Sequence, residues 1–63
     1  MDQIRVIYHD ESPHGWWAES PDVERWTAAG DSYDEVRQLA EDGVRFALER
    51  DDVIVVHLVP ASA

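Results

Sequence analysis

Histidines are the side chains in this sequence whose chemistry would first suggest a metal site or a proton-transfer site. The chain has three, His9, His14 and His57, and their spacing matches no known pair of metal ligands. No cysteine is present to complete a ligand set. Positions in loops and strands explain the three more simply. His57 is flanked by apolar residues and is expected in a sheet or an interface, so we predict no metal and no cofactor.

Carboxylates suggest one enzymatic alternative, because 14 of the residues are acidic. Asp10, Glu19 and Asp31 could converge for the two-metal chemistry of a nuclease. Such a site needs acids at strand centres, where the first expected strand has Val6 and Tyr8 instead. The sequence also lacks a nucleophile–base pair and a phosphate-binding loop. We predict that the protein is not an enzyme, and a degenerate nuclease is kept as the remaining enzymatic hypothesis.

Length and charge limit the classes of protein that remain. The 63 residues have room for one core, which predicts a single domain over 1–60 followed by a short tail, 61–63. The net charge of −9 argues against binding to nucleic-acid phosphates or to an anionic membrane. No apolar run approaches the roughly 20 residues of a membrane span, and the N-terminus lacks the pattern of a signal peptide. The expected location is the cytoplasm.

Four segments have the apolar patterning of strands. They are 4–9, 16–20, 25–29 and 53–59. In the first, Ile4, Val6 and Tyr8 alternate with other residues and therefore share one face. In the second, Trp16 and Trp17 must point to opposite faces, so only one of them can lie in the core, and we favour Trp16. The third segment is a weaker strand because it contains two alanines.

The helix is the most clearly marked element. Ser32 and Glu35 have the spacing of a capping box, and Asp31 adds negative charge at the positive end of the helix. Apolar and small residues then repeat three and four positions apart, which predicts one buried stripe. Its members are Val36, Leu39, Ala40, Gly43, Val44 and Ala47. Gly43 is expected to pack closely against the sheet, and residues 50–52 are expected to close the helix.

The predicted order of elements is β-β-β-α-β, an α+β fold. Three antiparallel strands should form a meander, and the helix should cross over to place the fourth strand beside the first, giving the strand order 3-2-1-4. One helix can cover only one face of such a sheet, so apolar side chains are expected to be exposed on the other face. These are Ile7, Trp17, Ile54, Val56 and Leu58. We therefore predict a homo-oligomer, most simply a dimer.

A motif of turn, packing and capping residues runs through the middle of the sequence. Residues 15–23 read Gly-Trp-Trp-Ala-Glu-Ser-Pro-Asp-Val, and residues 30–35 begin a helix with Gly-Asp-Ser followed by acids. This stretch resembles the HicB-like antitoxin family, whose members run glycine, aromatic residue, any residue, Ala, Glu, any residue, Pro, Asp, Leu. The matching positions are Gly15, Trp16, Ala18, Pro21, Asp22, Gly30, Asp31, Ser32 and Glu35. They are structural positions, so the resemblance specifies a fold better than an activity.

The sequence departs from the family pattern in two ways. After the Pro-Asp turn the family usually has Pro-Gly and an apolar residue, whereas here Glu24 and Arg25 precede Trp26, and Ala28 stands where a Thr is common. The turn, and any partner contact made there, is therefore built differently. Members of the family often carry a C-terminal ribbon-helix-helix or helix-turn-helix module. None is found up to Ala63, so repression of an operator by this chain alone is not expected.

The resemblance implies a partial ribonuclease H fold without its catalytic acids. It also implies a role in a bacterial toxin–antitoxin system, as the protein that neutralises HicA, a small basic mRNA interferase. A net charge of −9 suits attraction to such a cationic partner. The alternative is an orphan homo-oligomer of the same fold without a toxin. The candidate interface residues, for a partner or a second copy, are Ile7, Trp17, Glu19, Asp22, Glu24, Trp26, Ile54, Val56 and Leu58.

Overall fold

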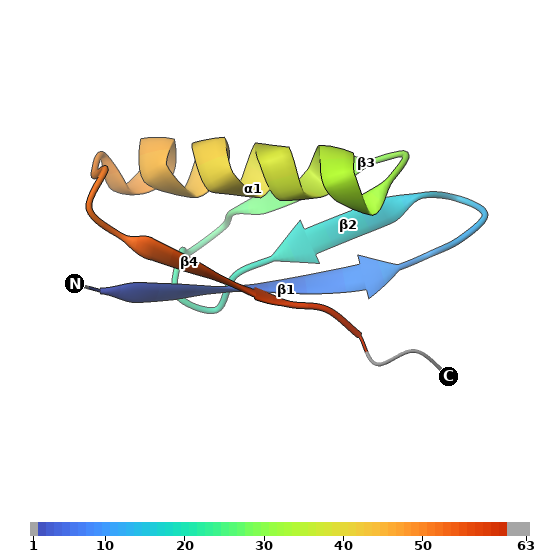
Figure 1. Cartoon of the computed structure of the whole chain (residues 1–63), viewed down its shortest axis with the longest axis horizontal. Coiled ribbons are helices and arrows are strands. Elements are labelled where there is room, and N and C mark those ends of the chain that lie inside the picture. Colours follow the sequence, from blue (N-terminus) through green and yellow to red (C-terminus); the bar gives the residue numbers. More distant parts are fainter. Residues whose placement is uncertain (1, 61–63) are drawn as a thin grey trace.

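Three strands, one helix and a fourth strand follow one another along the chain. The computed structural model describes residues 2–60 of the protein, and the expected tail, 61–63, lies outside the described residues. The elements are β1 (Gln3–Asp10), β2 (Trp16–Glu19), β3 (Thr27–Gly30), α1 (Tyr33–Leu48) and β4 (Ile54–Leu58). They form two layers, with α1 lying along one side of the sheet (Figure 1). The predicted β-β-β-α-β order is confirmed.

The four strands form one sheet in the order β3-β2-β1-β4, as predicted. The pairs β1–β2 and β2–β3 are antiparallel, and β4 runs parallel to β1. A parallel neighbour needs a crossover connection, which α1 provides. The register places Ile4 opposite Val55 and Val6 opposite His57, so these four side chains share a face.

The core lies between α1 and the face of the sheet that it covers. Alternation along β1 buries Ile4, Val6 and Tyr8, as the sequence predicts. From the helix, Val36, Ala40 and Val44 are fully buried against this face. Partly buried side chains complete the packing, namely Trp16, Trp26, Ala28, Tyr33, Leu48 and Val55. Trp16 is thus the tryptophan of β2 that packs against the core, as expected.

The buried stripe of the helix is narrower than the periodicity predicts. Leu39 is 44% exposed and Ala47 is also exposed, so the prediction that both are buried was wrong. The helix turns by about 100° per residue, which sets Leu39 well to one side of Ala40. The sheet therefore covers a single row of helix side chains spaced four apart, from Val36 to Leu48.

A tight turn shortens the third strand. The N–H of Trp26 donates to the carbonyl oxygen of Val23 across 3.3 Å, and Arg25 has a left-handed φ of 61°. The strand therefore begins at Thr27 instead of residue 25. The indole of Trp26 turns towards the helix, where a Cβ atom at Gly43 would lie 2.9 Å from its Nε1 atom. Gly43 is thus required by close packing, but against this indole and not against the sheet.

The helix is capped at both ends by residues close to those predicted. The Ser32 hydroxyl accepts from the N–H of Glu35 across 3.2 Å, and the Glu35 carboxylate accepts from the N–H of Asp31 instead of that of Ser32. At the other end the helix closes at Leu48, followed by Glu49 in the left-handed region with φ 55°. The prediction that residues 50–52 close the helix placed its end too far along the chain, because no glycine marks the left-handed position at Glu49.

Replacing the helix cap should lower stability by a measurable amount. Ser32→Ala removes the acceptor of the Glu35 N–H and should cost about 1 kcal/mol in the free energy of unfolding. Ser32→Asp, which restores an acceptor, should retain most of the stability of the wild type. Urea denaturation followed by circular dichroism measures both changes, and an unchanged midpoint for Ser32→Ala would show that the cap contributes nothing.

Candidate functional site

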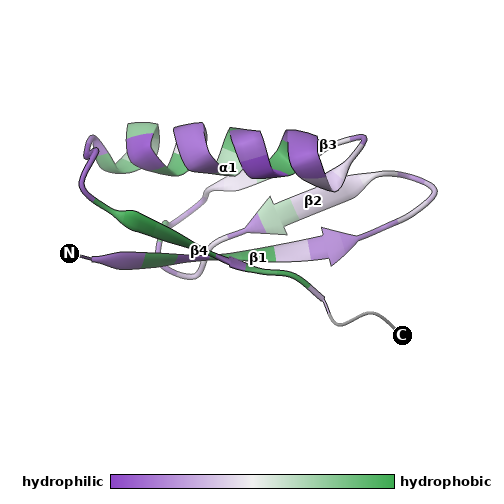
Figure 2. Cartoon of the chain, viewed as in Figure 1, coloured by the Kyte–Doolittle hydropathy of each residue, from purple (hydrophilic) through white to green (hydrophobic). Residues whose placement is uncertain are grey.

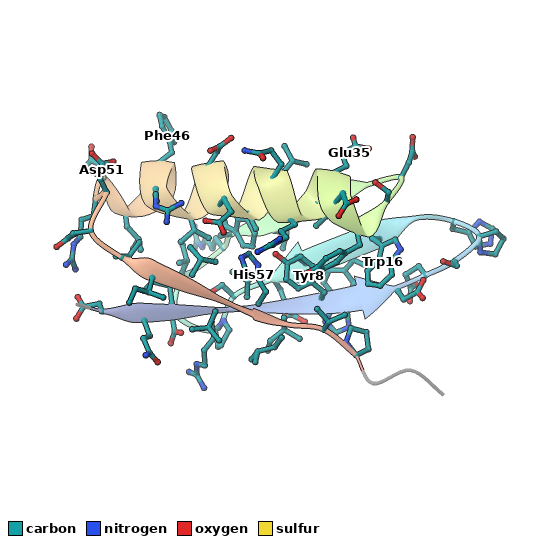
Figure 3. All side chains as sticks on the ribbon, viewed as in Figure 1. Tyr8, Trp16, Glu35, Phe46, Asp51 and His57 are labelled. Carbon is teal, nitrogen blue, oxygen red and sulfur yellow. The ribbon has the colours of Figure 1, made fainter. Side chains whose placement is uncertain are left out.

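A chain of hydrogen bonds joins the sheet to the helix inside the covered layer. His57 on β4 points towards α1, where its Nδ1 atom lies 2.5 Å from the Tyr8 hydroxyl and its Nε2 atom lies 2.8 Å from Oε1 of Glu41 (Figure 3). Burial raises the pKa of Tyr8 to about 12, so its hydroxyl keeps its proton and donates to Nδ1. The Glu41 carboxylate can only accept a hydrogen bond, so the Nε2–H group of His57 donates to it.

Glu41 is held in its ionised form by its neighbours. The hydrogen bond from His57, and then that from Arg45 at 2.7 Å, keep the pKa of Glu41 below its usual value. Arg45 also donates to the carbonyl oxygen of Val53 across 3.4 Å, so the chain continues to the segment before β4. The network thus connects β1, β4 and α1 through side chains that are far apart in the sequence.

The order hydroxyl, imidazole, carboxylate is that of a nucleophilic triad, but the geometry here does not give a reactant access. Tyr8 is only 2% exposed, and a raised pKa makes a phenol harder to activate. Neither of two shallow hollows found along α1 in the described chain is lined by Tyr8 or His57. What the arrangement does is fix β4 and α1 in place.

The three acids considered for two-metal chemistry lie apart. Asp10 ends β1 and accepts from the N–H of Ser12, whereas Asp31 precedes the helix. Glu19 is the last residue of β2, whereas Asp10 lies opposite the first, Trp16. The Glu19 carboxylate is hydrogen-bonded to His9. Within residues 2–60, no three His, Asp or Glu side chains form a group that could hold a metal ion.

The uncovered face of the sheet carries an apolar surface, which we call the open face. The register and the alternation of the strands place five apolar side chains on it. They are Ile7, Trp17, Ile54, Val56 and Leu58. Of these, Ile54 is 43% exposed and Leu58 is 42% exposed, and the others are half-buried. No other element covers this side of the described chain (Figure 1), and the apolar colour of β4 is visible in Figure 2.

Charged groups on the open face are paired with one another. Arg5 donates to Asp22 through its backbone N–H and its guanidinium at 2.9–3.1 Å, which lowers the pKa of Asp22 to about 2. His9 bonds Glu19 at 2.7 Å and stacks on Trp17 with ring centroids 4.1 Å apart. Arg5 and Asp22 cancel each other, and with histidines counted as neutral Glu19 is the charge that remains, so the face carries little of the net charge of −9.

The predicted interface residues separate into two groups. Glu19 and, through Arg5, Asp22 border the open face together with its five apolar residues. Trp26 lies on the helix side and packs against the core, and Glu24 is exposed in the turn that precedes it. The structure thus does not bring Trp26 to the surface where sequence reasoning grouped it. The turn at Arg25, whose φ is 61°, directs the chain so that Trp26 faces the helix.

Sequence reasoning assigned no role to Phe46, which is 86% exposed on the outer side of α1 (Figure 3). A phenylalanine outside the predicted stripe was the available signal, because a large apolar residue on the polar side of an amphipathic helix is costly to leave exposed.

Among the structural positions of the motif, Gly15 has a φ of 109°, and a Cβ atom there would meet the carbonyl oxygen of Gly30 at 2.5 Å.

The comparisons with known proteins leave the family open. No protein-family model, curated protein sequence or solved structure matches this chain. Among the described residues, no helix combines the length and apolar character needed to cross a membrane. The fold and the site define a small α+β protein in which one sheet face is packed under a helix and the other is open, apolar and nearly neutral.

Removing the Tyr8 hydroxyl should test the network directly. Tyr8→Phe keeps the ring but leaves Nδ1 of His57 without its donor, which should cost about 1–2 kcal/mol in the free energy of unfolding at neutral pH. Tyr33→Phe is the matched control, because no hydrogen bond of the Tyr33 hydroxyl is found within residues 2–60 and its ring packs on that of Tyr8. Equal losses in the two variants would show that the hydrogen bond is unimportant.

The stability of Tyr8→Phe and that of the wild type should also depend differently on alkaline pH. The raised pKa of about 12 means that the unfolded chain loses the Tyr8 proton first, near the ordinary value of about 10. The stability that comes from Tyr8 is therefore complete below about pH 10 and falls as the pH rises to 12. Urea denaturation across this range should show a steeper loss for the wild type than for Tyr8→Phe.

Proposed function

We propose that this chain is a non-enzymatic protein-binding module of the HicB-like antitoxin type, which pairs with itself and neutralises a small basic mRNA interferase of the HicA type. The observation that carries the proposal is the open face, an apolar and nearly neutral surface on a strongly acidic chain. The resemblance of residues 15–36 to the family supports it at the level of sequence. A cytoplasmic location is part of the proposal, because mRNA is the interferase's substrate.

A second copy of the chain is the proposed occupant of the open face. Burying each large apolar side chain fully is worth about 1.5–3 kcal/mol, and a domain of this size has little stability in reserve. Two chains of charge −9 repel one another, so they should meet where charge is lowest. The open face meets this condition because Arg5 is paired with Asp22, which leaves Glu19 as its one uncancelled charge among residues 2–60.

The remaining acidic surface is the proposed attraction for a basic partner. Since the open face contributes little net charge, most of the −9 lies on the helix, the turns and the strand ends. An acidic surface steers a cationic protein towards it and raises the association rate. A basic ribonuclease of the HicA type fits this requirement, and covering its RNA-binding surface would inhibit it.

An orphan homo-oligomer without a toxin is the second candidate. The open face favours it specifically, because self-association accounts for that surface without any other partner. The two candidates agree on the dimer and differ in the need for a basic partner, so separate measurements distinguish them.

A single charge on the open face should abolish self-association. Sedimentation of the wild type at tens of micromolar should give about twice the monomer mass of 7.2 kDa. Trp17→Glu should sediment as a folded monomer, because a carboxylate would be buried without a partner at the interface. Gln38→Glu adds the same charge on the exposed side of the helix and should remain dimeric. A monomeric wild type, or a dimeric Trp17→Glu, would overturn the assignment of this face.

Inhibition of a HicA-type interferase tests the antitoxin proposal. The purified chain in slight molar excess should abolish mRNA cleavage and should form a complex that is stable in size-exclusion chromatography. Because of its net charge it should not bind the RNA by itself at physiological salt, which separates neutralisation from competition for the substrate. Undiminished cleavage by the HicA-type interferase, with the dimer of this chain intact, would favour the orphan homo-oligomer.

A further inference from the structure

The outer side of the helix carries a second apolar surface, remote from the open face. Phe46 is 86% exposed and projects away from the sheet (Figure 3), and Leu39 is 44% exposed. The two are seven residues apart, or two turns of helix, so they lie on the same side of α1. Neither side chain contributes to the core. Folding of the single chain therefore leaves the apolar surface of Phe46 in contact with water, which is unfavourable.

Acidic side chains lie along one side of this apolar pair and beyond the end of the helix. Glu35 and Asp42 are also seven residues apart, and Asp42 lies between Leu39 and Phe46 at helical spacings of three and four. Beyond the end of the helix, Glu49 and Asp51 line a shallow hollow together with Phe46. All four acids are exposed, and within residues 2–60 none of them forms an ion pair.

The arginines that share the hollow are already engaged. Arg45 is paired with Glu41 at 2.7 Å, and Arg50 with Asp2 at 2.6 Å and Asp52 at 2.9 Å. Their positive charges are therefore largely balanced by these neighbours. The surface that remains is an apolar ridge with an uncompensated acidic border, which we call the Phe46 ridge.

A second copy of the chain does not fit the Phe46 ridge. Two such surfaces would bring their acidic borders together, and like charges at close range oppose association. The ridge is therefore unlike the open face, whose charges are paired. Its complement has apolar residues for Leu39 and Phe46 and cations for the acids beside them. The apolar pair and the acidic pair on α1 each have a spacing of seven residues. A second helix is the element best suited to contact both, because its own apolar and charged rows can repeat at the same spacing.

We propose that the Phe46 ridge is the docking surface for a basic amphipathic helix of a partner protein, with Phe46 as its central anchor. The inference rests on the proposed function, since it names the surface and the structural element by which a cationic partner would be held. It leaves the open face to the second copy, so one chain could bind both at once.

A synthetic peptide tests the ridge without knowledge of the natural partner. The probe is an amphipathic peptide of about 20 residues, long enough to be helical in water, with leucines along one face and lysines beside them. Binding to the full chain is measured by fluorescence anisotropy at low salt. The same peptide with glutamates in place of lysines should not bind.

Two pairs of variants locate the peptide on the surface. Phe46→Ala should weaken binding about tenfold or more, as loss of an aromatic anchor does. Val59→Ala removes another exposed apolar side chain, away from the ridge, and should leave binding unchanged. Asp42→Lys should weaken binding about fivefold at low salt, and the difference should vanish near 1 M salt. Glu11→Lys makes the same charge change in the β1–β2 turn and should have little effect.

The outcomes separate this inference from the proposed function. No binding to the wild type, or equal binding to wild type and Phe46→Ala, would overturn the ridge as a docking surface. Loss of binding in Trp17→Glu, with binding retained in Phe46→Ala, would place the peptide on the open face and would also overturn it. Circular dichroism checks that each variant is folded. The inhibition of the interferase by the wild-type chain decides the proposed function independently of all these results.

Discussion

One helix lying on a four-stranded sheet is the constraint from which the other features of this protein follow. The helix can bury only one face, so the core consists of the side chains of the strands and connecting segments that point towards it, together with one row from α1. That core is small, and hydrogen bonds add to it. Tyr8, His57 and Glu41 connect the central strand, the edge strand and the helix, and this network holds β4, whose other side has no cover in the described chain.

The distribution of charge gives the two remaining surfaces different properties. On the open face, Arg5 is bound by Asp22 and His9 by Glu19, which leaves an apolar surface with little charge. On the outer side of the helix, the arginines near Phe46 are bound to other acids, and the carboxylates next to it are unpaired among residues 2–60. A chain with so many acids can thus present one surface suited to its own copy and another suited to a cationic protein.

Much of the fold follows from local signals. The alternation of Ile4, Val6 and Tyr8 predicted which side of β1 is buried, and the spacing of Ser32 and Glu35 predicted where the helix begins. The open face could also be derived from strand periodicity alone, because its members alternate within each strand. The partner of Gly43 could not, since it is an indole that reaches the helix only after the turn at Arg25 has redirected the chain.

By itself, the sequence determined the order of the elements, the strand order and the existence of an uncovered apolar face. These depend on patterns within a few residues and on the fact that one helix has one apolar side. Only the tertiary structure decided that His57 faces the helix, that Leu39 remains outside the core and that Trp26 lies away from the open face. They depend on the register of β4, on how far the sheet reaches around α1 and on the turn at Arg25, and no single segment encodes how these parts meet.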